Sequence, residues 1–242
     1  MLNFSDPHIT DQQRFWEAWN PEMRDPDHVN EWSRKRAESI LQLLQSLNID
    51  HPNILDFGCG TGWLSEMLAN FGPTTGVDLA ESVIATAKSR SPHITYIAGD
   101  IFQIPLPNNH FDIVVSQEVI AHVTDQAAYL DRVAQVLKPQ GYLIITTPNK
   151  FIIDRGDFPP QPPEHIERWL TMRKFKRLLR SRFQLLRSTS ILPMGDRGIL
   201  RFINSNKLNS LLGFFVSQRY LIALKEQIGL GYTLIALAQK PY

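Results

Sequence analysis

The sequence predicts an α/β fold, in which helices pack against a largely parallel β-sheet. Short β-branched or apolar runs alternate along the chain with segments whose apolar residues recur at helical spacing. This alternation is typical of right-handed βαβ units. The chain has 242 residues, of which 43% are hydrophobic and 20% charged, so it is long enough to bury a full core. We therefore expect one large domain, or one domain with additions at its ends.

The expected elements follow one another in a regular order. Strands are predicted at residues 53–57, 74–77, 94–98, 111–116 and 141–146, with helices at 63–71, 81–89 and 126–137. Proline and glycine in residues 138–141 predict a helix end followed by a turn. Residues 11–47 have a helical pattern ahead of this core. Beyond it come a proline-rich connection at 148–163, a basic helix starting near Thr171, and strands at 183–190 and 232–238 separated by a helical insertion around 206–227.

Composition excludes several classes of protein. The single cysteine, Cys59, has no partner for an internal disulfide, and no Cys/His spacing resembles a zinc site, so we expect no metal. The first residues are polar, and charged residues interrupt the long apolar stretch near the C-terminus, so no transmembrane segment is expected. We expect a soluble, cytoplasmic protein.

Charge is divided unevenly along the chain, although the formal net charge is only +1. Residues 168–242 contain 14 Lys/Arg and 2 Asp/Glu, a net charge of +12, whereas residues 1–167 contain 11 and 22, a net charge of −11. Such an asymmetry points to an anionic partner at the basic end, for example an anionic substrate, a membrane surface or nucleic acid. A solvated helix face that binds nothing explains it equally well.

The motif ILDFGCGTGWL places Gly58, Gly60 and Gly62 between the first predicted strand and the first helix. Without β-carbons, the backbone can approach a ligand closely, and the helix N-terminus offers free amides to an anionic group. Asp78 ends the second strand, 22 positions after Asp56, where a carboxylate can accept hydrogen bonds from both ribose hydroxyls. A glycine turn needed only for packing is the alternative, but together these features predict a nucleoside-bearing ligand.

The glycine spacing differs from the dinucleotide-binding pattern G-x-G-x-x-G, because Asp56 precedes a G-x-G-x-G loop. A carboxylate there suits an ammonium group and would repel a pyrophosphate. At this point the chain resembles the class I S-adenosylmethionine (SAM)-dependent methyltransferases, particularly the small-molecule branch that includes the ubiquinone-pathway enzymes. The matching stretches are ILDFGCGTG, GVDLA, AGDI, FDIVVSQEVIAHV and LKPQGYLIITTPN, in the right order over about residues 50–150.

The resemblance implies a Rossmann-like, seven-stranded, mostly parallel sheet whose last strand is antiparallel. It also implies SAM as cofactor, S-adenosylhomocysteine as product, and a set of contact residues. The methionine end would meet Asp56, Gly58, Cys59, Gly60 and Gln117, the ribose Asp78, and the adenine Leu79, Asp100 and Ile101. Two further candidates have plain alternatives: Arg36 could bind the cofactor carboxylate or be a surface arginine, and Trp16 could cover the sulfonium or simply pack.

Methyl transfer is an in-line displacement, so catalysis rests largely on positioning, with a base where the acceptor must lose a proton. The candidate bases are His165, at the end of the proline-rich loop, and His122, after the fourth strand. His165 is the preferred base, since a histidine at the position of His122 commonly makes a structural hydrogen bond in the family that the chain resembles.

We expect residues 1–48 to form a helical N-terminal lid on a core of residues 49–242, with the loop 148–166 and the insertion 191–230 on the substrate side.

The expected activity is methylation of a small organic acceptor, taken to be at oxygen, and the acceptor could be anionic. Methylation of RNA or another anionic macromolecule and a non-catalytic SAM-fold subunit are the alternatives. Nucleic acid is not expected, because no aromatic-basic surface pattern is visible. Contact with a membrane surface stays open, and the sequence does not indicate an oligomeric state.

Overall fold

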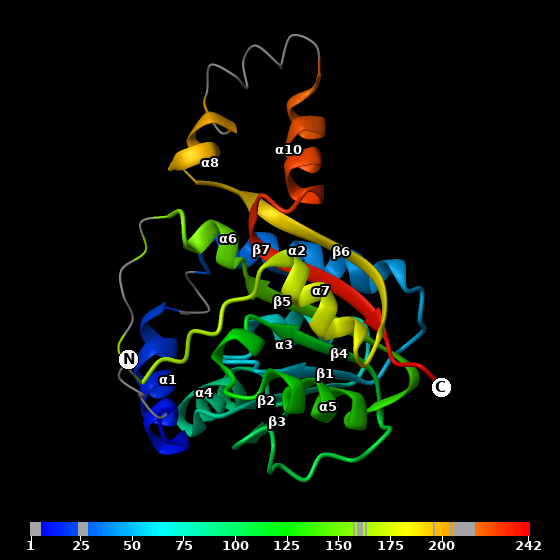
Figure 1. Cartoon of the computed structure of the whole chain (residues 1–242). Helices are drawn as coiled ribbons and strands as arrows, with labels where there is room; N and C mark the ends of the chain where they lie inside the picture. The colour runs from blue at the N-terminus through cyan, green and yellow to red at the C-terminus, as the bar shows by residue number, and fades with distance from the viewer. Residues whose placement is uncertain are drawn as a thin grey trace.

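The structure, a computed structural model, describes residues 6–23, 29–156, 158, 162, 164–195, 197–203, 205 and 216–242. Its centre is a seven-stranded sheet in the order β3-β2-β1-β4-β5-β7-β6 (Figure 1). The strands are β1 (Ile54–Phe57), β2 (Thr74–Asp78), β3 (Thr95–Ala98), β4 (Phe111–Gln117), β5 (Leu137–Pro148), β6 (Gln184–Pro193) and β7 (Gly231–Gln239). Neighbours from β3 to β5 pair in parallel, and β7 runs antiparallel to both β5 and β6. The α/β fold and the antiparallel last strand predicted from the sequence are confirmed.

Side chains of the strands alternate between two apolar layers, as the period of a strand requires. Leu55 and Val114 belong to the layer beneath α5 (Gln126–Val136) and α7 (Met172–Arg180), whereas Ile54 and Ile113 belong to the layer beneath α2 (Glu31–Ser46) and α3 (Trp63–Leu68). The central strands are buried on both faces, which explains why their sequences are continuous apolar runs.

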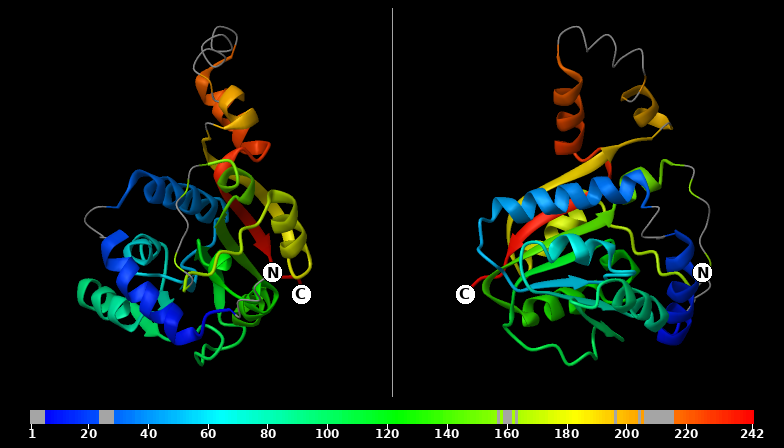
Figure 2. Two further views of the ribbon diagram at one scale, coloured as in Figure 1. Left: turned by 60° about the vertical axis from the view of Figure 1, so that its left-hand side comes forward. Right: turned by 180° about the vertical axis from the view of Figure 1, so that it is seen from behind.

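The N-terminal segment, expected to be helical throughout, contains two helices with different positions. α2 packs on the sheet through Ala37, Ile40 and Leu44, and its first turn is capped by the side chain of Asn30. α1 (Ile9–Met23) lies instead beside α4 (Glu81–Arg90), at the edge where the parallel strands end (Figures 1 and 2). Of these two helices, α1 is therefore the one that lies over that edge of the sheet.

Several predicted boundaries shift in the structure. The helix predicted at 63–71 ends at Leu68 as α3, and the turn predicted at 138–141 is absorbed into β5. There the register with β4 jumps between Phe111 and Ile113, and Gln140 takes a φ of 64°, so the helix does end but the residues form a bulge. The predicted proline-rich connection at 148–163 contains the short helix α6 (Lys150–Ile153) near its start.

The insertion between β6 and β7 projects away from the sheet (Figures 1 and 2). Its described helices are α8 (Gly198–Ile203) and α10 (Gln218–Gln227), and residues 206–215 of the predicted insertion lie outside the described part of the chain. Leu200 of α8 is fully buried in a small cluster with Ile152 and Leu230, which anchors the base of the projection. Within the described residues, no helix combines the length and apolarity needed to cross a membrane.

Candidate active site

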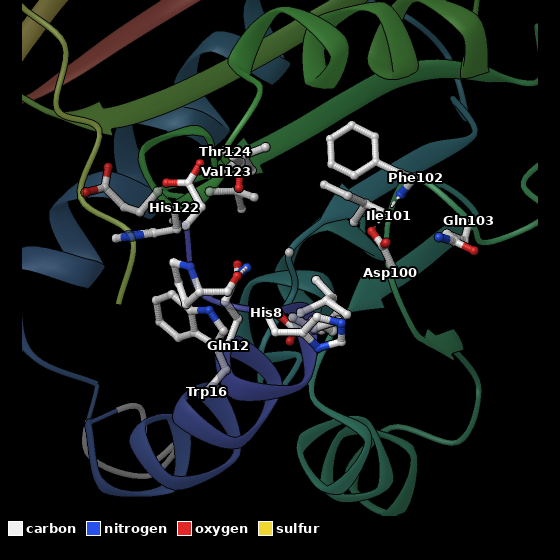
Figure 3. Close-up of a pocket in the computed structure, with 18 of the residues that line it drawn as sticks. His8, Gln12, Trp16, Asp100, Ile101, Phe102, Gln103, His122, Val123 and Thr124 are labelled. Carbon is white, nitrogen blue, oxygen red and sulfur yellow. Dashed lines mark hydrogen bonds between the residues drawn. The ribbon is translucent and has the colours of Figure 1, made fainter. Parts of the chain in front are cut away.

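The candidate site lies at the carboxyl ends of the parallel strands, where the chain order of the sheet reverses between β1 and β4. Open α/β sheets bind ligands at such a switch point. A cavity of about 530 Å³ occupies this position, between the strand ends and α1 (Figure 3). Eight of the residues singled out from the sequence line this cavity, namely Trp16, Gly58, Asp78, Leu79, Asp100, Ile101, Gln117 and His122.

The glycine loop after β1 brings backbone to the cavity wall. Gly58 has a φ of 89°, and a β-carbon there would collide with the side chain of Val119. Gly62, at the start of α3, has a φ of 80°, and a β-carbon there would collide with the hydroxyl of Tyr96. Both positions therefore require glycine, for backbone conformation and for space. Gly58 itself lines the cavity, so a ligand can approach its main chain.

Asp78 joins the glycine loop to the end of β2. One of its carboxylate oxygens accepts the N–H of Gly60 at 2.8 Å, and the other accepts the N–H of Ala80 at 3.0 Å. Asp78 also lines the cavity, so a ligand there meets its carboxylate. Asp100, after β3, similarly accepts the N–H of Phe102 at 3.0 Å while lining the cavity. Two carboxylates are thus held in fixed orientations along one wall.

Three sequence-predicted residues lie behind the wall instead of on it. Asp56 is buried and accepts a hydrogen bond from Ser65 Oγ at 2.6 Å. Cys59 is buried and packed against Gly76, and its N–H donates to the carbonyl of Val77. Gly60 meets Asp78 through its N–H and does not line the cavity either. These residues hold the loop in shape from below.

Arg36 reaches the site from α2, although it does not line the cavity. Its guanidinium donates to Ser33 Oγ at 3.0 Å and lies 4.0 Å from the carboxylate of Glu118, and both charged side chains are largely buried. Nε of Arg36 and Oε1 of Glu118 have no hydrogen-bond partner among the described residues. Glu118 also has a φ of 61°, which is strained for a residue with a side chain. The pair leaves unused hydrogen-bonding capacity beside the cavity.

His122 and His165 stack on each other, with ring centroids 4.5 Å apart. Phe15 of α1 stacks on the other face of His165 at 4.7 Å, and Trp16 packs edge-on against His122 at 4.9 Å. His122 lines the cavity, whereas His165 does not. Figure 3 shows His122 beside the α1 side chains Gln12 and Trp16. α1 is therefore docked over the cavity by an aromatic stack.

The two histidines differ in their hydrogen bonds. Nδ1 of His122 lies 2.9 Å from the carbonyl oxygen of Ile166, which can only accept, so Nδ1 carries the proton and Nε2 is the basic nitrogen of the neutral ring. Both ring nitrogens of His165 are buried, with no hydrogen-bond partner in the described part of the chain. Burial lowers the pKa of His165 to about 4. His165 is therefore neutral at pH 7.

Further cavity residues had not been identified from the sequence. Ile9 and Gln12 follow the same face of α1 as Trp16, at spacings of three and four residues, so the helical period could have found them. Glu118 directly follows the predicted residue Gln117. The preceding segment, with Asp6 and His8, gave no sequence signal, and its position depends on a two-oxygen ion pair between Asp6 and Arg168 at 2.7 and 2.9 Å.

No group of three or more His, Cys, Asp or Glu side chains that could hold a metal ion occurs in the described ranges. Residues 55–145 match the family model described as "Methyltransferase domain". Over these residues the chain is similar to methyltransferase domains. The matched residues run from β1 through most of β5, so the match includes the glycine loop, Asp78, Asp100 and His122.

Curated relatives match a little more than half of the chain in sequence. A Mycolicibacterium smegmatis protein named "Probable S-adenosylmethionine-dependent methyltransferase" is 32% identical over 137 residues, which cover 56% of this chain and 52% of that protein. The ubiquinone biosynthesis O-methyltransferase of Coxiella burnetii is 34% identical over 139 residues, covering 54% and 57% of the two chains. The chain spans about half the length of these curated relatives.

Solved structures resemble the whole fold at low sequence identity. The N-methyltransferase NodS of Bradyrhizobium japonicum WM9, solved with S-adenosylhomocysteine, is 18% identical with a TM-score of 0.67, covering 96% of this chain and all of that one. The [4+2]-cyclase SpnF is 16% identical with a TM-score of 0.70, covering 98% of each chain. Since proteins named for different reactions share this fold, the fold alone does not define the reaction.

Proposed function

We propose that the protein transfers a methyl group from SAM to a small organic acceptor, at an oxygen atom. The main support is the convergence of Gly58, Asp78, Asp100 and Gln117, from the ends of four neighbouring strands, on one cavity beneath α1. Their chemistry suits SAM, because two oriented carboxylates can accept from a ribose diol and an adenine amino group, and Gly58 admits close backbone contact. Of the curated relatives, one is named for SAM-dependent methyl transfer and one for O-methyl transfer, and both names support the same reading.

The methionine end of SAM would lie toward Gly58, Gln117 and the Arg36–Glu118 pair. Arg36 has an unpartnered Nε to offer a carboxylate, and Glu118 an unpartnered oxygen to offer an ammonium group. A buried ion pair with unused hydrogen-bonding capacity is costly unless another group completes it. An amino-acid end would supply both missing partners at once.

When bound, SAM supplies a methyl group on a positively charged sulfur, which an acceptor oxygen displaces in line. The protein must then exclude water, orient the acceptor and remove its proton. We assign proton removal to Nε2 of His122, because His122 lines the cavity and its tautomer is fixed by the carbonyl of Ile166. This reverses the preference drawn from the sequence. His165 lies outside the cavity lining and its pKa near 4 makes it a weak base, so we assign it to docking α1.

Isothermal titration with SAM, S-adenosylhomocysteine and NAD tests the cofactor assignment, with binding expected for the first two only. Asp131→Ala is a suitable control variant, because Asp131 forms a surface ion pair with Arg182 far from the cavity lining. Tight NAD binding without a SAM signal would contradict the proposal.

Methyl transfer is then measured from labelled SAM to acidic metabolites, lipids and RNA in separate pools. Binding of SAM without transfer in any pool would favour a non-catalytic subunit, and transfer to RNA would favour the macromolecular alternative.

A further inference from the structure

The projecting helix α10 exposes an apolar stripe. Tyr220, Leu224 and Ile228 follow one another at spacings of four residues, which places them on one face, and they are 62%, 44% and 62% exposed. The helix is held to the sheet along one flank of this stripe, where Leu221 is buried, and through the hydroxyl of Ser190, which donates to the carbonyl of Glu226 at 2.7 Å. We call the exposed stripe of Tyr220, Leu224 and Ile228 the α10 outer face.

The α10 outer face belongs to a basic stretch of sequence. From Arg197 to Lys225 the chain contains five Lys/Arg and no Asp/Glu. Arg201 of α8 and Arg219 of α10 are exposed among the described residues. An amphipathic helix with apolar residues on one side and cations near it is the composition that binds the surface of an anionic bilayer.

The connection between α8 and α10 has the same character in sequence. Residues 206–215, which lie outside the described part of the chain, include five Leu or Phe, one lysine and no acidic residue. The ends of this connection are at α8 and α10, on the part of the molecule that projects from the sheet (Figures 1 and 2). The apolar and basic composition of the sequence therefore extends from the α10 outer face back along the chain to α8.

We propose that the α10 outer face docks on a membrane surface containing anionic lipids. Docking would transfer Tyr220, Leu224 and Ile228 from water to the boundary between head groups and acyl chains, while Arg201 and Arg219 meet the lipid phosphates. A second copy of the chain is a poorer occupant, because a symmetric contact would bring two such basic stretches together. The proposal concerns attachment and does not depend on the methyl-transfer assignment.

Flotation with vesicles tests the proposal, using phosphatidylcholine with and without phosphatidylglycerol. We expect the wild type to float with the anionic vesicles and to dissociate at high salt. The double variant Leu224→Ser, Ile228→Ser should bind roughly 10-fold or more weakly, because two large apolar side chains no longer insert. Met67→Ser is the matched control, since Met67 is an exposed apolar residue on α3 and should not change binding. SAM titration of each variant checks that the fold is retained.

Three outcomes would overturn the proposal. The first is a wild type that does not float with anionic vesicles, and the second is a double variant that floats as well as the wild type. The third is a wild-type dimer in sedimentation velocity that the double variant dissociates while vesicle binding is absent, which would assign the α10 outer face to a contact between copies. None of these outcomes bears on SAM binding, so failure here is distinguishable from failure of the proposed function.

Discussion

His122 donates from Nδ1 to the carbonyl oxygen of Ile166 at 2.9 Å, and this bond joins the end of β4 to the loop that precedes α7. The bond fixes which ring nitrogen is basic, at a residue on the cavity wall. If Nε2 removes the acceptor proton, His122→Asn should lower kcat by roughly 10² to 10⁴-fold, the usual contribution of general-base catalysis. SAM affinity should stay within about twofold. A variant that keeps its kcat would remove His122 from the chemistry.

The low pKa of His165 makes stability depend on pH in a defined window. Its pKa is about 4 in the folded protein against an ordinary value of 6.5, so between these values the unfolded chain binds more protons. The free energy of unfolding should therefore be fully developed above pH 6.5 and fall as the pH drops toward 4. The loss should be ~1–3 kcal/mol, less than the full shift implies because the carboxylate of Glu167, 3.6 Å from Nδ1, partly stabilises the protonated ring.

His165→Phe is the variant that checks this dependence. Phenylalanine keeps the ring that stacks between Phe15 and His122 but cannot bind a proton. Urea unfolding at a series of pH values should show a flatter profile for the variant between pH 6.5 and 4. Equal slopes for the two proteins would mean that other groups cause the acid sensitivity.

Asp78→Ala should weaken SAM binding by ~1–3 kcal/mol, the cost of leaving polar partners without an acceptor. The N–H groups of Gly60 and Ala80 lose their acceptor in the same substitution, so thermal stability should fall as well. Titration calorimetry gives the affinity, and Asp131→Ala again serves as the control. An unchanged affinity would place the ribose elsewhere.

Removal of α1 tests whether this helix is a lid. Deleting residues 1–28 should leave the sheet folded, because α2 begins only at Glu31 and keeps its own apolar contacts. Turnover should be lost or redirected, since the deletion removes Gln12 and Trp16 from the cavity wall and exposes the histidine stack to water. Circular dichroism checks the fold. A truncated protein with full activity would contradict the lid role.

The basic face of α7 offers a test of an anionic acceptor. Arg173 and Arg177 are exposed, one turn apart, while Phe175 and Leu179 on the same helix are fully buried. If these cations attract the acceptor, reversing both to glutamate should raise KM about 10-fold at low salt and remove most of its salt dependence, with SAM binding unchanged. Unchanged kinetics would identify the face as a solvated surface.

The core strands could be read from the sequence because their apolar runs are buried on both faces, and because glycine and aspartate mark the strand ends that meet the cavity. The sequence could not show that α2 packs on the sheet whereas α1 lies over the cavity. Both helices are amphipathic, and they differ only in the residues that they contact. The reversal between His122 and His165 was equally hidden. A histidine becomes a base or a packing ring according to which nitrogens meet a partner, and that depends on the loop around Ile166, far along the chain.

The pairing of β6 with β7 has a consequence for how this protein could diversify. Pro193 and Gly231 are register partners, so the chain leaves the sheet and returns to it at neighbouring points. The insertion between them is topologically the connection of a β-hairpin. Such a connection can be lengthened, shortened or exchanged without changing the order of the strands in the sheet. Natural or engineered grafts at this junction can therefore bring the protein to new surroundings while the cavity at the ends of the parallel strands stays unchanged.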